Sequence, residues 1–193
     1  RHPCRGSRPR HDLELLSPMQ LTRASRETSA VALIGNPNTG KTTLFNALTG
    51  LSQRVGNYPG VTVERKTGSV ELPDGAQIEL LDLPGTYSLS ATSPDEMIAV
   101  DVLLDEEQET RLDAVIAIVD AGNLRRNLYL VSQLLEADLP VVIALNMTDV
   151  ATARGIRIDA IRLSSHLGVP VIPMVPPKNG PSAACSKPVR RST

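Results

Sequence analysis

The chain has 193 residues, a length typical of one domain with some excess at its ends. Hydrophobic residues make up 41% of it and the formal net charge is −1, so it can bury a core, and bulk charge points to neither nucleic acid nor an anionic membrane as a partner. Its two cysteines, Cys4 and Cys185, exclude a disulfide framework or a cysteine-rich zinc site, and no stretch approaches the roughly 20 apolar residues of a membrane helix.

The two ends of the chain differ in composition from the middle. Residues 1–29 are rich in Arg, Ser and Pro without a sustained apolar period, which predicts a disordered leader or upstream read-through, with Met19 as a candidate start. Residues 30–175 are expected to form the folded domain. Residues 176–193 show neither helical nor strand periodicity and are interpreted as an irregular tail, truncated or frameshifted.

Apolar patterning and turn residues divide the first half of the domain into elements. Pro73-Asp74-Gly75 between two strand-like runs is typical of a hairpin, and Ser93 followed by Pro94 indicates a helix start. The pattern predicts, in chain order, a buried strand over 30–34, a helix over 42–48, a loop over 53–61, strands over 64–72 and 76–81, and a helix from 94 to about 104.

The second half alternates strands and helices. Continuous apolar runs over 114–119 and 141–145 are typical of parallel strands buried on both faces, and a helix is predicted between them over 124–137. A helix over 158–167 and a strand over 169–173 follow. This alternation predicts an α/β fold with a mostly parallel sheet and helices on both faces, in which ligands bind at the carboxyl ends of the strands.

A phosphate-binding loop follows the first predicted strand. The run Gly35-Asn-Pro-Asn-Thr-Gly-Lys-Thr42 matches G-x-x-x-x-G-K-[ST] between a strand and a helix, which is the structural context that this motif requires. Backbone amides of such a loop hold phosphate oxygens, Lys41 reaches the β- and γ-phosphates, and the Thr42 hydroxyl binds magnesium. The residues predicted to contact nucleotide here are Gly35, Asn36, Asn38, Thr39, Gly40, Lys41, Thr42 and Thr43.

Magnesium and switch elements are expected in the two segments that follow the first helix. Asp82-Leu83-Pro84-Gly85 ends a predicted strand, so Asp82 can hold magnesium and the Gly85 amide can contact a γ-phosphate. Thr62 in the Gly-Val-Thr-Val segment is predicted to bind the same ion only when GTP is bound. Lys41, Thr62 and Gly85 are therefore the candidate catalytic residues.

A base-reading motif follows the strand over 141–145. Asn146-Met147-Thr148-Asp149 fits N-x-x-D, with Met147 where Lys is commoner. The Asp149 carboxylate can accept two hydrogen bonds from guanine, a donor pair that adenine lacks, so a mismatch leaves it unpaired. Asn146 is expected to brace the loop, and Met147 to cover the base.

The residues around the second switch predict slow hydrolysis. Many GTPases place a Gln directly after D-x-x-G to orient the attacking water, and this chain has Thr86 there. The Asn38 amide oxygen could hold a monovalent cation that offsets developing charge. The residues alone leave this open, because Asn is also a common turn residue. Arg125 and Arg126 are interpreted as surface residues rather than as an arginine finger.

Six blocks of sequence resemble the N-terminal G domain of the ferrous iron transport protein B (FeoB) family. They include the loops between the nucleotide motifs, so the resemblance is specific and covers about residues 30–175. The blocks are Gly35–Gly50, Val55–Glu64, Asp82–Leu89, Ser93–Glu96, Val119–Leu130 and Pro140–Asp149.

This resemblance implies a Ras-like P-loop GTPase domain that binds GTP or GDP with Mg²⁺ and hydrolyses GTP slowly, with K⁺ as activator. It implies Asn38 as a potassium ligand, completed by carbonyls near Gly56 and Tyr58. It further implies regulation of bacterial ferrous iron uptake at the cytoplasmic face of the inner membrane, through a membrane domain absent from this chain. The fragment itself is expected to be soluble, without a nucleic-acid partner, and a homo-oligomer is one possible assembly.

Two departures from the family pattern keep alternatives open. Tyr58 stands where Trp is frequent, and the run from Met174 to Gly180 replaces an expected second base-contacting loop, with no closing helix after it. A non-catalytic guanine-nucleotide sensor or fragment is therefore one alternative, which the missing Gln also supports. A ribosome-assembly GTPase is another, although it predicts Asn-Lys-x-Asp and a basic RNA-binding domain, and neither appears in the sequence.

Overall fold

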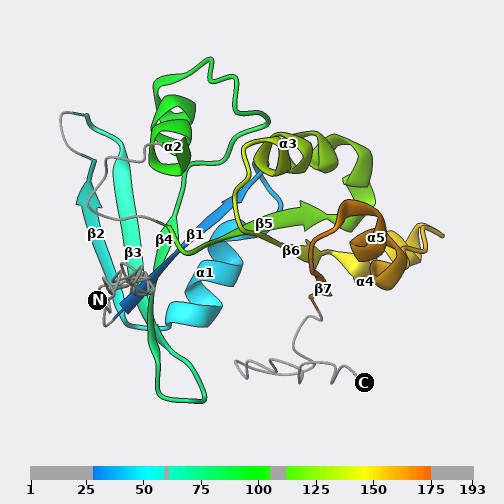
Figure 1. Ribbon diagram of the computed structural model, residues 1–193, viewed down its shortest axis with the longest axis horizontal. Helices are drawn as coiled ribbons and strands as arrows, with labels where there is room; N and C mark the ends of the chain where they lie inside the picture. The colour runs from blue at the N-terminus through cyan, green and yellow to red at the C-terminus, as the bar shows by residue number, and fades with distance from the viewer. Residues whose placement is uncertain (1–27, 59–60, 105–111, 175–193) are drawn as a thin grey trace, which may run out of the picture.

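The computed structural model describes residues 28–58, 61–104 and 112–174. The expected tail over 176–193 and nearly all of the expected leader lie outside these residues. The described residues form an α/β sandwich with one continuous sheet at its centre (Figure 1).

The sheet has seven strands in the described residues, in the order β2-β3-β4-β1-β5-β6-β7. Neighbours from β4 to β7 run parallel, whereas β3 pairs antiparallel with both β2 and β4. The strands are β1 (Thr28–Gly35), β2 (Gln53–Asn57), β3 (Glu64–Glu71), β4 (Gln77–Asp82), β5 (Ala114–Asp120), β6 (Val141–Asn146) and β7 (Val171–Pro173).

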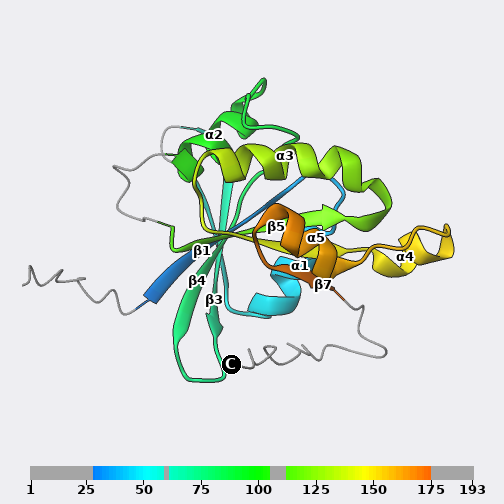
Figure 2. The ribbon, with the colours of Figure 1, turned by 45° about the vertical axis from the view of Figure 1, so that its right-hand side comes forward.

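Helices cover both faces of this sheet. In Figures 1 and 2, α1 lies against one face and α2 and α3 lie against the other. The helices are α1 (Lys41–Thr49), α2 (Pro94–Leu104), α3 (Leu124–Glu136), α4 (Thr148–Ala153) and α5 (Ala160–Leu167), with a 3₁₀ turn η1 (Ala121–Asn123) before α3. None of the helices in the described part of the chain has both the length and the apolar character of a membrane span.

Alternation along the central strand explains its continuous apolar run. Ala32 and Ile34 of β1 belong to the core cluster under α2 and α3, whereas Val31 and Leu33 belong to the cluster that contains Phe45 of α1. Because successive side chains of a strand point to opposite faces, a strand covered on both faces must be apolar at every position.

The predicted fold class is confirmed, and the strands and helices that were predicted occur in the predicted order, including the hairpin of β3 and β4 and the Ser93 cap, whose Oγ accepts a hydrogen bond from the Glu96 amide (3.2 Å). Three local predictions were wrong. The predicted loop over 53–61 contains β2, whose mostly exposed residues give no apolar alternation. The helix α4 was not predicted, and α5 begins at Ala160 because the Asp159 carboxylate caps the amides of Ile161 and Arg162.

Candidate functional site

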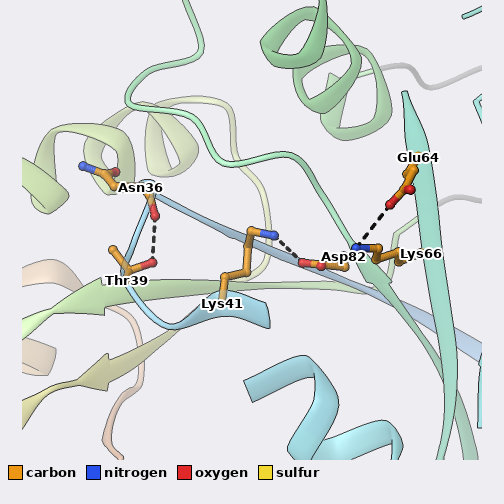
Figure 3. A network of polar contacts seen from close by, with 6 residues as sticks. All are labelled: Asn36, Thr39, Lys41, Glu64, Lys66 and Asp82. Atoms are coloured by element: carbon orange, nitrogen blue, oxygen red, sulfur yellow. Dashed lines mark hydrogen bonds and ion pairs between the residues drawn. The ribbon is translucent and has the colours of Figure 1, made fainter. Parts of the chain in front are cut away.

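The loop between β1 and α1 is built close to its neighbours. A Cβ on Gly35 would lie 3.0 Å from the Thr39 hydroxyl, and Thr39 Oγ1 donates to the Asn36 carbonyl (2.8 Å, Figure 3). Gly40 has φ 87° and is the N-cap of α1, so it offers no side chain to the first amides of that helix. Within the described residues no side chain caps these amides, which the sequence motif predicts to bind phosphate oxygens.

Lys41 at the start of α1 forms an ion pair with Asp82 at the end of β4 (Figure 3). Their side chains are only 12% and 6% exposed, so each charge depends on the other for compensation. The two sequence-predicted ligands of phosphate and magnesium are thus brought together. In this conformation the two charges neutralise one another.

Asn36 lies in the same loop with its side chain almost fully buried. Within the described residues, neither its Oδ1 nor its Nδ2 has a hydrogen-bond partner. Buried amides of this kind are rare, and in native structures they call for a specific explanation, which can be a functional one. Sequence reasoning placed Asn36 at the nucleotide but gave no sign of this burial.

The base-reading motif lies next to the phosphate loop. Asn146 Nδ2 donates to the Thr39 carbonyl (2.9 Å), and a Cβ on Gly40 would collide with the same amide group. Asn146 therefore connects the predicted base-reading motif to the phosphate loop. Met147 follows with φ 55°, a left-handed conformation that is uncommon outside Gly, and it turns the chain into α4.

Asp149, the predicted guanine ligand, lies exposed in the first turn of α4. The Thr148 hydroxyl beside it donates to the Met174 carbonyl after β7 (3.2 Å), which ties this loop to the place where a second base-contacting loop was expected. The rest of that run, from residue 175 on, lies outside the described residues.

The predicted first-switch residues and the threonines of α1 differ in exposure. Thr62 is exposed, as are Gly56 in β2 and the hydroxyl-bearing Thr42 and Thr43 on α1. Tyr58 differs from them: its ring is buried in the core cluster under α2, and this burial raises the pKa of its hydroxyl. Its carbonyl accepts a hydrogen bond from the Val61 amide (3.3 Å).

The second switch begins directly on the phosphate loop. The Thr86 amide donates to the Gly35 carbonyl (3.2 Å), and a Cβ on Gly85 would be 3.4 Å from the Pro37 nitrogen. The Thr86 side chain is fully buried, and its hydroxyl donates to the Ser88 carbonyl (2.7 Å). This hydroxyl is therefore committed to the chain itself in the described conformation.

A separate hollow of about 600 Å³ lies at the start of α3, where residues of η1 and the first turns of α3 form its wall. Sequence reasoning gave no signal for it. The lining residues are Gly122, Asn123, Leu124, Arg125, Arg126 and Tyr129. Within the described ranges, no group of three or more His, Cys, Asp or Glu side chains could hold a metal ion by itself.

These features define the class of protein. A glycine-rich loop between a buried strand and a helix, an Asp at the end of the neighbouring strand and an N-x-x-D motif braced on that loop form the nucleotide site of a P-loop G domain.

Comparison with known proteins gives the family. The profile of the family described as ferrous iron transport protein B matches residues 29–184, so the chain belongs to the ferrous iron transport protein B family. It is 55% identical to the Fe(2+) transporter FeoB of Salmonella typhimurium and 56% identical to that of Escherichia coli K12, over 149 residues in each case. Each alignment covers 75% of this chain but only 19% of the transporter, so the chain spans about a fifth of the length of these relatives.

Solved structures of the same family share the fold. A mutant of S. thermophilus NFeoB bound to GDP has 54% identity and a TM-score of 0.69, with 76% of this chain and 55% of that chain covered. The cytosolic domain of L. pneumophila FeoB has 55% identity and a TM-score of 0.71, covering 76% and 56%. The G domain of the T. maritima transporter has 46% identity and a TM-score of 0.69, covering 76% and 86%.

Proposed function

We propose that this domain binds GTP and GDP, hydrolyses GTP slowly as a switch, and regulates ferrous iron uptake through the membrane part of a longer protein at the inner membrane. The observation that carries the proposal is the convergence of three strand ends. Lys41 and Asp82 meet beside the phosphate loop, and Asn146 holds that loop from the base-reading side. The GDP-bound structures of S. thermophilus relatives support it.

Phosphate binding would use the loop backbone and Lys41. The amides from Asn36 to Thr43 would hold the α- and β-phosphates, and the Lys41 amine would move from Asp82 to the β- and γ-phosphates. The Gly85 amide would contact the γ-phosphate, and its position directly beside Pro37 fits that role. Hydrolysis would then remove the contact that holds the second switch.

The oxygen donors of the site fit a magnesium ion. Asp82 offers a buried carboxylate that already compensates a cation, and the Thr42 hydroxyl is exposed in the first turn of α1. Thr62, which is exposed in this conformation, is the third proposed ligand. When bound, Mg²⁺ would offset negative charge on the β- and γ-phosphates.

A potassium site would use Asn38. Its φ of 66° sets its side chain in a left-handed turn of the loop, at an exposed position. The carbonyls of Gly56 and Tyr58 would complete the site. The Tyr58 carbonyl accepts a hydrogen bond from the Val61 amide here, and its second lone pair could bind the ion.

Guanine recognition would use Asn146, Met147 and Asp149. The Asp149 carboxylate is exposed and carries no hydrogen bond among the described residues, so it can accept both guanine donors. The left-handed Met147 starts α4 one residue after the Asn146 brace, which fixes where Asp149 can reach.

A second candidate function, a guanine-nucleotide sensor that scarcely turns over, is favoured by Thr86. This residue occupies the place of the water-orienting Gln, yet its side chain is 0% exposed and bonded to Ser88. Family membership gives no support to the ribosome-assembly alternative.

Multiple-turnover GTP hydrolysis by the whole chain, measured in KCl and in NaCl, separates the two candidates. The proposed switch predicts slow turnover that is faster in KCl. Nucleotide binding without turnover in either salt would establish the sensor instead. Turnover that is equal in both salts would retain the GTPase but exclude the potassium site.

A further inference from the structure

Two side chains of α3 hold the segment that follows Gly85. The Arg126 guanidinium carbon lies 4.1 Å from the centre of the Tyr87 ring, a cation–π contact. Gln133 Oε1 accepts a hydrogen bond from the Leu89 amide (2.8 Å). Arg126 and Gln133 are seven residues apart, about two helical turns, so both lie on the same face of α3.

The other end of this segment rests on the phosphate loop. The Thr86 amide donates to the Gly35 carbonyl, and Gly85 packs against Pro37. The chain from Gly85 to Leu89 is therefore held at both ends, by the nucleotide loop at one end and by α3 at the other. A movement of Gly85 toward a γ-phosphate pulls on Tyr87 and Leu89, because only one residue separates Gly85 from Tyr87.

We propose that Arg126 and Gln133 are positioning residues of the second switch. They stabilise the conformation in which Thr86 contacts Gly35, and so set how readily the Gly85 amide turns to a γ-phosphate. This inference rests on the proposed function and adds that α3, through Arg126 and Gln133, opposes the movement of the second switch. Arg125 and Arg126 were both interpreted from the sequence as surface residues, and the contact with Tyr87 gives Arg126 a role in addition.

Loss of the α3 contacts should change the binding of nucleoside triphosphates selectively. GDP lacks the γ-phosphate, so it gains nothing from release of the segment, whereas a GTP analogue does. Weakening the α3 contacts should therefore strengthen binding of the analogue without changing GDP binding. A side chain that only stabilises the fold would affect both nucleotides alike.

The experiment measures dissociation constants of fluorescent GDP and of a fluorescent non-hydrolysable GTP analogue for the whole chain. Variants are Arg126→Ala, Gln133→Met and Tyr87→Ala, with Arg125→Ala as the matched arginine control and Tyr87→Phe to keep the ring. The measured quantity is the dissociation constant of GDP divided by that of the GTP analogue. We expect this ratio to rise about threefold or more in Arg126→Ala, Gln133→Met and Tyr87→Ala, and to stay unchanged in the two controls. The double variant Tyr87→Ala/Arg126→Ala should raise the ratio no more than either single substitution does, because both substitutions remove the same contact.

Three results would overturn the proposal. One is an unchanged ratio in all variants. Another is an equal loss of affinity for both nucleotides, accompanied by a lower thermal midpoint, which would assign Arg126 and Gln133 a structural role. The third is a shift in Arg125→Ala as large as in Arg126→Ala. If the unaltered chain bound neither guanine nucleotide, the proposed function itself would fail, and that outcome is visible before any variant is compared.

Discussion

The phosphate-binding half and the base-reading half of the site differ in whether their charged side chains already have partners within the chain. On the phosphate side, Lys41 and Asp82 are buried and paired with each other, and Thr86 is bonded to the loop. On the base side, Asp149 is exposed, and only Asn146 binds across to the loop.

This difference has a physical basis. The phosphate side lies at the centre of the sheet, at the ends of β1 and β4, where an uncompensated charge is costly. The base side follows β6, near the edge of the sheet, where water can solvate a carboxylate. Substitutions on the phosphate side should therefore lower both stability and binding, and those on the base side should lower binding alone.

The largest expected effect comes from Lys41→Met. Removing the ammonium leaves the Asp82 carboxylate buried without its partner, so the free energy of unfolding should fall by about 3 kcal/mol. Denaturant unfolding without nucleotide measures this change. Lys66→Met is the matched control: Lys66 pairs with Glu64 at 3.3 Å, but the two side chains are 37% and 62% exposed, so the loss should stay below about 1 kcal/mol. Equal losses of unfolding free energy in the two variants would contradict the contrast between a buried and an exposed ion pair.

Asp149→Asn should weaken GDP binding by about 2 kcal/mol or more, because a charged acceptor of two hydrogen bonds becomes a neutral amide. Its unfolding free energy should change by no more than about 0.5 kcal/mol, since the side chain is exposed. Calorimetric titration with GDP provides the measurement, with Asp101→Asn on the exposed side of α2 as control. Unchanged GDP affinity would refute the base-reading role.

Asn38→Ala should abolish potassium stimulation of hydrolysis while sparing GDP binding, so the activation barrier in KCl should rise by about 1.4 kcal/mol for each tenfold of stimulation that is lost. Alanine is also disfavoured at the φ of 66° found here, so Asn38→Gly, which tolerates that angle, separates the two effects. Both variants should lose the stimulation if the amide oxygen holds the ion. Stimulation that persists in the Gly variant would leave Asn38 as a turn residue only.

The smallest expected effect concerns Glu96 in α2. Hydrogen bonds from the Thr92 amide and hydroxyl lower the pKa of its carboxyl below the ordinary value of 4.5. A lowered pKa in the folded state means that this stabilisation is present above about pH 4.5 and is lost as the pH falls through the folded pKa. Thermal midpoints of Glu96→Gln and of the unaltered chain should therefore differ near neutral pH and converge in acid. A constant gap at all pH values would assign the difference to packing.

The locations of the two predicted halves of the site could be inferred from the sequence, whereas the contrast between them could not. Glycine spacing, the strand-to-helix context and the N-x-x-D motif located both halves of the site, because these patterns reflect local backbone requirements. The pairing of Lys41 with Asp82 could not be predicted, because it joins residues 41 positions apart whose predicted roles both involve the nucleotide.

Other features lacked any local signal. The burial of Tyr58 depends on packing under α2, and the contact of Arg126 with Tyr87 depends on where α3 lies over the second switch. The strand β2 carries mostly exposed side chains, so its pairing with β3 was invisible to an apolar pattern. In each case tertiary contacts determine what the segment does.

The most direct test of the account is a titration of the whole chain with fluorescent GDP in potassium and magnesium, competed with unlabelled GDP and ADP. We expect displacement by GDP and none by ADP at the same concentration, because Asp149 can pair only with guanine's donor pair. Equal displacement by both nucleotides would contradict guanine recognition by Asn146 and Asp149, and absence of any binding would contradict the nucleotide site itself.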